Sequence, residues 1–159
     1  MKPKLVARGL GKRGIQHTAW AAVCGAAAEL FRRDYDVTFT LGSTPRVDML
    51  CGAPNGKAFS VQVKGLSGEY GFYIDKSFFD GKDEDLFLVV VLVPYGEREP
   101  LLFFELSHVE AKKEFSKMPR IHRDGTPLKK SGPGLNWGSV KGYRGWGSLE
   151  RWAQCSGGG

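Results

Sequence analysis

The sequence predicts an α/β or α+β fold in which a mixed central sheet is flanked by helices. Three observations predict it: an Ala-rich helical segment near the start, several strand-like segments after it, and a capped helix after the last of these. Such an order is typical of helices packed in layers against one sheet. The 159 residues fit one domain that is long enough to bury a core.

The first predicted element is a helix over residues 15–33. Alanine dominates it, and Arg32 and Arg33 fall in its last turn, where the helix dipole favours cations. Gly25 interrupts the helix and would permit close packing against a sheet. Residues 1–14 are basic and contain glycine, so they predict a flexible arm that either lies along phosphates or has no partner.

Six segments after this helix have strand character. Residues 58–64 alternate strictly between apolar and polar side chains, and an Asn-Gly pair at 55–56 is the signal of a tight hairpin before them. The β-branched run 85–93 predicts a buried central strand. The remaining strands are expected at residues 37–41, 46–50, 71–74 and 101–106.

The last third of the chain begins after a capped helix. Ser107 and Glu110 have the spacing of a capping box, which predicts a helix to about residue 115. Residues 136–152 then interleave aromatic with basic side chains, and two interpretations stay open: the Trp side chains cover the sheet, or they stack on nucleic-acid bases. We expect one domain over residues 15–152 and a disordered tail over 153–159.

The composition limits the classes of function. A formal net charge of +6 and a pI near 9.3 favour a polyanionic partner, usually nucleic acid. No apolar run of the sequence is long enough for a bilayer, and the N-terminus lacks the apolar stretch of a secretory signal, so we expect a cytoplasmic protein. The three cysteines and three histidines lack the spacing of a zinc site or a disulfide framework.

Three polar residues stand in strand-like segments where core residues are expected. Asp48 precedes the hairpin, and Gln62 and Lys64 share one face of the strand after it. Adjacent strands lie about 4.8 Å apart, so Asp48 can reach the same spot. A carboxylate and an amide oxygen suit Mg²⁺, and a neighbouring lysine can orient a water and stabilise charge on a phosphate. An ordinary solvated polar stripe is the alternative.

The chain has a predicted helix, a strand, a second strand with RVD at residues 46–48, a turn, and a third strand with QVK at residues 62–64. This order of elements and motifs resembles the PD-(D/E)XK nuclease superfamily. The Gln-x-Lys form is similar to that of Mrr-type restriction nucleases, and the overall layout is similar to that of Holliday-junction resolvases. The resemblance covers about residues 15–110. It implies a restriction-endonuclease-like fold and a metal-dependent endonuclease, a phosphodiesterase that acts on DNA.

The same resemblance assigns expected roles to individual residues. It implies that Asp48 and Gln62 hold Mg²⁺ or Mn²⁺ and that Lys64 positions the attacking water, with Gln62 also counted in the catalytic set. Members usually carry a Glu on the first helix, and the corresponding residue here is Val23. The one acid on this helix, Glu29, is therefore a candidate for a water-orienting role.

Basic residues complete the predicted site. Those expected to contact DNA are Lys12, Arg13, Arg46, Lys129, Lys130, Lys141 and Arg144. Nucleases of this kind often dimerise to cut two strands, so a homodimer is a further expectation. The alternative function is a catalytically inactive protein of nuclease fold that binds DNA or serves in assembly, for instance as a phage or defence-system component, with a pure protein-interaction role as a third hypothesis.

Overall fold

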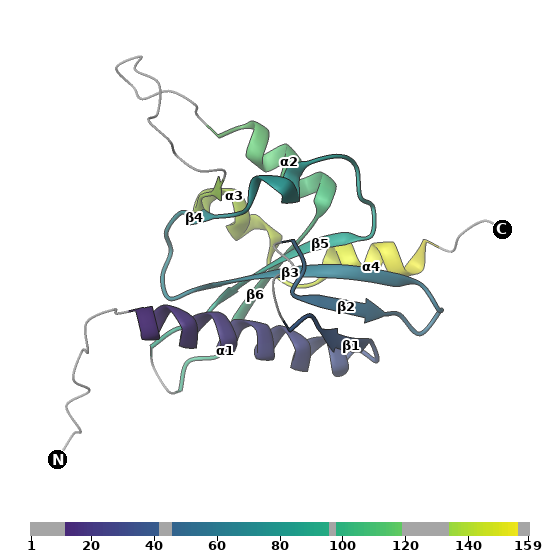
Figure 1. Ribbon diagram of the computed structural model, residues 1–159, viewed down its shortest axis with the longest axis horizontal. Coiled ribbons are helices and arrows are strands. Elements are labelled where there is room, and N and C mark those ends of the chain that lie inside the picture. The colour runs from purple at the N-terminus through teal and green to yellow at the C-terminus, as the bar shows by residue number, and fades with distance from the viewer. Residues whose placement is uncertain (1–11, 42–45, 96–97, 119–133, 156–159) are drawn as a thin grey trace.

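A computed structural model describes residues 12–41, 46–95, 98–118 and 134–155 of the chain. Within these residues the protein has an α/β fold, a five-stranded mixed sheet with one parallel pair that packs against four helices (Figure 1). Most of the predicted arm, the predicted contacts Lys129 and Lys130, and the last four residues lie outside the described part. Over that part, no helix combines the length and hydrophobicity needed to cross a bilayer.

The helices and strands up to residue 116 follow the predicted order, whereas the 3-10 helix Lys76–Phe79 and the elements after residue 133 were not predicted. The helices are α1 (Lys12–Phe31), α2 (His108–Ser116), α3 (Trp137–Val140) and α4 (Gly147–Gln154), with short 3-10 helices η1 (Lys76–Phe79) and η2 (Lys141–Tyr143). The strands are β1 (Asp36–Phe39), β2 (Met49–Gly52), β3 (Ala58–Leu66), β4 (Phe72–Tyr73), β5 (Leu86–Leu92), β6 (Leu102–Ser107) and β7 (Gly134–Leu135). The predicted capping box is confirmed, since the Ser107 side chain accepts from the Glu110 N–H and the Glu110 carboxylate accepts from the Ser107 N–H.

Two boundaries differ from the prediction in ways that matter. Helix α1 begins at Lys12, three residues before the predicted start, so the end of the predicted arm is helical. Strand β2 begins at Met49, so Asp48 lies one residue before the strand and not inside it. Because Asp48 lies outside the strand, its side chain is not required to point to one of the two faces of the sheet.

The main sheet has the strand order β1-β2-β3-β5-β6. All neighbours are antiparallel except β3 and β5, which are parallel and occupy the centre of the sheet. The β2–β3 hairpin turns at Gly56, whose φ of 83° lies in the left-handed region that glycine adopts without strain. Strands β4 and β7 form a separate pair.

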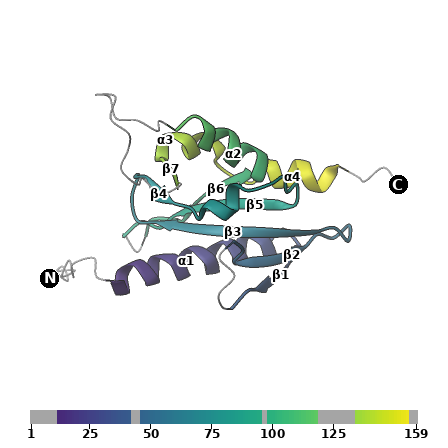
Figure 2. The same cartoon turned by 45° about the horizontal axis from the view of Figure 1, so that its top comes forward.

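Two apolar clusters cover the two faces of this sheet. Helices α1 and α4 supply one cluster with residues such as Leu30 and Leu149, and η1, α2 and α3 supply the other with Phe78, Ala111 and Val140. Figure 2 shows α1 on one side of β3 and helices α2 and α3 on the other. The long central strand β3 is therefore enclosed by both layers.

Helix α1 packs directly on the backbone of β3. At Gly65 an added Cβ would lie 2.7 Å from the Thr18 carbonyl oxygen and 2.8 Å from the Ala22 Cβ, so no larger residue fits without movement. Ala22 and Ala26 are fully buried in this interface. Small side chains in α1 therefore bring the helix up to the strand that carries the QVK segment.

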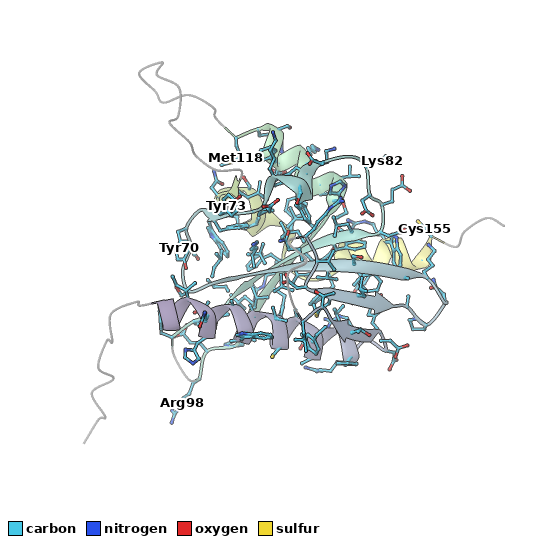
Figure 3. The ribbon with its side chains drawn as sticks, viewed as in Figure 1. Tyr70, Tyr73, Lys82, Arg98, Met118 and Cys155 are labelled. Atoms are coloured by element: carbon cyan, nitrogen blue, oxygen red, sulfur yellow. The ribbon has the colours of Figure 1, made fainter. Side chains whose placement is uncertain are left out.

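The aromatic side chains of the C-terminal region pack on the sheet. Figure 3 shows side chains filling the space between the sheet and the helices that cover it. Trp152 lies 5.1 Å from Phe59 between ring centroids, and Trp137 lies 4.8 Å from Phe104. Trp146 is buried. Of the two interpretations open for these tryptophans, coverage of the sheet is the one that the structure shows.

A buried carboxylate anchors the last helix. Glu105 on β6 is 2% exposed, and its Oε2 accepts hydrogen bonds from the N–H groups of Ser148 (2.9 Å) and Leu149 (3.1 Å) in the first turn of α4. Burial raises the pKa of Glu105 to about 7, against the opposing effect of these two hydrogen bonds.

Candidate functional site

Asp48 is attached to β3 through both its backbone and its side chain. Its N–H donates to the Val61 carbonyl at 2.8 Å, and its Oδ2 accepts from the Val63 N–H at 2.7 Å. The carboxylate thus takes the place of a backbone acceptor in the β2–β3 ladder. Since ladder hydrogen bonds lie in the plane of a sheet, the carboxylate sits at the level of the sheet, beside the residue that separates Gln62 from Lys64.

Gln62 and Lys64 lie next to this carboxylate along β3. Met49 pairs with Val61, so the register continued by one residue sets Asp48 opposite Gln62. Gln62 is 4% exposed, whereas Lys64 is half-buried. The backbone positions of the three residues predicted to form a site are therefore adjacent. Val61 and Val63 pack in the apolar cluster under α1, so Gln62 and Lys64 point to the opposite face of β3.

Asp75 joins this neighbourhood from a segment in which no site residue was predicted. It caps η1, and its carboxylate accepts from the Ser77 N–H at 2.9 Å. Hydrogen bonds from Ser77 lower the pKa of Asp75, and the positive charge of Lys64 lowers it further, which sets these two side chains within electrostatic reach. No local pattern in the sequence marks this proximity, because it relates β3 to the cap of a 3-10 helix across a loop.

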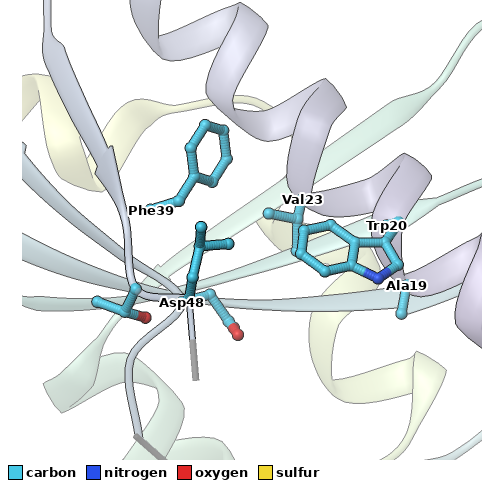
Figure 4. Close-up of a pocket in the computed structure, with 7 residues that line it drawn as sticks. Ala19, Trp20, Val23, Phe39 and Asp48 are labelled. Carbon is cyan, nitrogen blue, oxygen red and sulfur yellow. The ribbon is translucent and has the colours of Figure 1, made fainter. Parts of the chain in front are cut away.

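An open pocket of about 390 Å³ lies beside Asp48. Figure 4 shows Trp20 and Val23 of α1 facing Phe39 and Asp48 across it. The other lining residues are Ala19, Thr40 and Leu41. Val23, the position where the resemblance expects a glutamate, thus lines the same pocket as Asp48, and its side chain is apolar.

Glu29 lies in the last turn of α1, at the C-terminal end of the helix. Its carboxylate forms ion pairs with Arg33 (2.5 Å) and Arg32 (3.1 Å), and these contacts lower its pKa. Six residues separate it from Val23, which is about 9 Å along a helix axis. Glu29 is not among the residues that line the pocket. Its water-orienting role stays a prediction that this geometry does not favour.

The predicted DNA-contacting residues are spread over several elements. Arg46, two residues before Asp48, pairs with Asp83 (3.7 Å) and donates to the Asp80 carbonyl (3.4 Å). Lys141 and Arg144 are exposed in and after η2. Lys12 and Arg13 form the first residues of α1. Of these residues, Arg46 is the one that the sequence places directly beside the candidate site.

The donor set tests whether the site suits a divalent metal. Among the described residues, no group of three or more His, Cys, Asp or Glu side chains is placed to hold a metal ion. The oxygen donors predicted for this place are the Asp48 carboxylate, whose Oδ2 also accepts from the Val63 N–H, and the Gln62 amide. Mg²⁺ is often bound through one or two carboxylates with waters and a substrate phosphate. These residues therefore fit a weakly bound Mg²⁺ ion, for which a substrate phosphate supplies part of the coordination shell.

Comparison with known proteins adds no assignment. No family model matches the chain, and no match was found to a curated protein or to a solved structure.

Proposed function

We propose that this protein is a Mg²⁺-dependent or Mn²⁺-dependent endonuclease of restriction-endonuclease-like fold that hydrolyses phosphodiester bonds in DNA. One observation carries the proposal: the Asp48 carboxylate is hydrogen-bonded to the backbone of β3 between Gln62 and Lys64. This contact supports the D…QxK relationship of the PD-(D/E)XK resemblance, because it joins the acid to the QxK segment in space.

The residues have distinct roles in this proposal. Asp48 and Gln62 would hold the ion, which when bound polarises the phosphate and lowers the pKa of a water. Asp48 is fixed by the Val63 N–H, so its carboxylate needs no rearrangement to receive a phosphate-bound ion. Lys64 is half-buried beside it, where its ammonium group orients the attacking water and offsets negative charge on the phosphate in the transition state.

A cleavage assay on plasmid DNA with Mg²⁺ or Mn²⁺ tests this proposal. We expect Asp48→Asn and Lys64→Ala to lower the cleavage rate by about 100-fold or more, which is the usual effect of removing one preorganised charge-stabilising group. Asp36→Asn and Lys113→Ala are matched controls, because both residues are exposed on other elements. Wild-type rates in Asp48→Asn and Lys64→Ala, with unchanged circular dichroism, would exclude the mechanism.

A second candidate is a catalytically inactive DNA-binding or assembly protein with the same fold. Val23 favours it, because the pocket beside Asp48 is apolar at the position where an acid is expected. This candidate predicts that DNA affinity falls steeply with salt and that neither metal supports cleavage. Cleavage that requires Asp48 would exclude it.

A further inference from the structure

The pocket beside Asp48 is bordered by exposed apolar side chains. Trp20 is 55% exposed, Phe39 is 37% exposed and Leu41 is 82% exposed. Large apolar groups that gather around a hollow, in place of being scattered, are typical of a binding site. The pocket volume of about 390 Å³ lies within the roughly 300–1,000 Å³ of sites for small organic groups.

The pocket also borders the proposed phosphate site. Asp48 lines it, and the same carboxylate is held by the Val63 N–H between Gln62 and Lys64. A group that fills the pocket therefore lies next to the residue that would act on the phosphate. In a DNA strand, the group that adjoins each phosphate is the nucleoside of the same nucleotide.

We propose that this pocket binds an unpaired nucleobase of a DNA strand, with the base stacked on the Trp20 indole. A base inside a duplex has both faces covered by its neighbours, so it cannot enter a pocket unless it is unstacked. Aromatic side chains stack on any base, and the net charge of +6 favours the attached phosphates. The substrate class is then single-stranded DNA, or a flap or junction with unpaired nucleotides.

This inference rests on the proposed function for the choice of DNA, but it concerns a separate set of side chains. The apolar walls from Trp20, Val23 and Phe39 offer stacking and no charge, whereas Asp48 stands at one side of the pocket. The pocket can therefore select the strand state of the DNA while Asp48, Gln62 and Lys64 select the phosphate.

Fluorescence anisotropy with a labelled oligothymidine and with a duplex of equal length tests the inference at low salt. We expect Trp20→Ala to weaken binding of the single strand roughly 5- to 150-fold, the range for loss of one base–aromatic stack. Trp20→Phe should keep most of the affinity, because phenylalanine also stacks. Duplex binding should change little, since a stacked base cannot reach Trp20 and the duplex would be held through its phosphates alone. Tyr73→Ala is the control, because Tyr73 is an exposed aromatic residue on β4, away from α1 in Figure 3.

An abasic oligonucleotide makes the test specific for a base in the pocket. Wild-type protein should bind a strand of abasic nucleotides as weakly as Trp20→Ala binds oligothymidine, and Trp20→Ala should bind both strands equally. Equal affinities of wild type and Trp20→Ala for oligothymidine would overturn the inference, as would an equal loss for strand and duplex.

The two proposals can fail separately. If Asp48→Asn abolishes cleavage while Trp20→Ala binds every probe like wild type, the pocket inference is wrong and the nuclease proposal stands. If Trp20-dependent strand binding is found but DNA is cut with neither metal, the inference stands and the nuclease proposal is wrong.

Discussion

The carboxylates of Glu105 and Asp48 both accept hydrogen bonds from backbone N–H groups, but in opposite surroundings. Glu105 receives two N–H groups of α4 inside the core and is 2% exposed. Asp48 receives one N–H group of β3 and borders an open pocket. Both carboxylates are held by backbone N–H groups, so the two differ in how accessible they are to solvent and ligands.

This difference separates a structural carboxylate from a candidate functional one. At Glu105, burial raises the pKa to about 7, so in the folded protein the carboxyl group keeps its proton until the pH approaches 7. A group in this state attaches a helix to a strand and is closed to ligands. Asp48 has the same kind of backbone anchor but keeps one side open. An anchored carboxylate with an open side is preorganised for a ligand.

The largest effect on stability is expected for Glu105→Ala. It removes the acceptor of two buried N–H groups and leaves a cavity, so the free energy of unfolding should fall by about 2–5 kcal/mol. Glu105→Gln retains an acceptor oxygen and should lose much less. Urea unfolding followed by circular dichroism measures both. Equal stability of wild type and Glu105→Ala would show that α4 does not depend on this contact.

The buried carboxyl group of Glu105 should make the stability of the protein depend on pH. The folded-state pKa of Glu105 is about 7, above its ordinary value of 4.5, so the folded state binds the proton more tightly. Its contribution is complete below about pH 4.5 and is lost as pH rises to about 7, by roughly 3 kcal/mol at 1.36 kcal/mol per pKa unit.

The difference between wild type and Glu105→Gln isolates this contribution. Glu110 raises the pKa of Glu105 and Arg151 lowers it, and both residues remain in the variant. His108, whose pKa is lowered by burial, contributes with the opposite sign in both proteins, because it favours the folded state as pH rises. We expect the difference in unfolding free energy to vary between pH 4.5 and 7 and to level off above that range. A difference that is constant with pH would contradict the burial argument.

Local signals in the sequence predicted most elements of the fold. The strict alternation over residues 58–64 in β3, the Asn-Gly turn and the Ser107 capping box each depend on residues close together in the chain. The anchoring role of Glu105 was not predicted, because its partner Ser148 is 43 residues away. A contact at that separation leaves no periodic pattern in the strand that carries the acid.

The candidate site was also predicted only where it depends on residues close together in the chain. Asp48, Gln62 and Lys64 follow from hairpin geometry, which a short turn determines. Trp20 was missed, because it lies in an Ala-rich helix whose composition predicts packing, and only the position of α1 on Gly65 shows which side chains border the pocket. Asp75 was missed because its proximity to Lys64 depends on the path of a loop.

Val23→Glu would make the pocket at Asp48 more like a two-carboxylate metal site. Without metal, a second acid in a partly apolar pocket should lower the unfolding free energy by about 1–2 kcal/mol through desolvation and repulsion. Mn²⁺ should recover this loss, because paired carboxylates are good ligands for a hard cation. Melting temperatures with and without Mn²⁺ measure the effect, and Val23→Gln is the control of equal shape. Identical responses of the two variants to Mn²⁺ would show that position 23 and Asp48 do not share an ion.

The smallest effect is expected for Glu29→Ala, which tests a third carboxylate on α1. Glu29 is partly exposed in the last turn of α1 and pairs with Arg32 and Arg33, which follow the helix and do not, as predicted, lie in its last turn. Such pairs are worth about 0.3–0.5 kcal/mol each. Its loss should therefore lower stability by less than about 1 kcal/mol, and less still at high salt because exposed pairs are screened. We expect DNA cleavage to remain near the wild-type rate, since the Glu29 carboxylate is held at the arginines and does not line the pocket of Asp48. A large fall in cleavage without a fall in stability would instead assign Glu29 the water-orienting role and make α1 a source of catalytic acid.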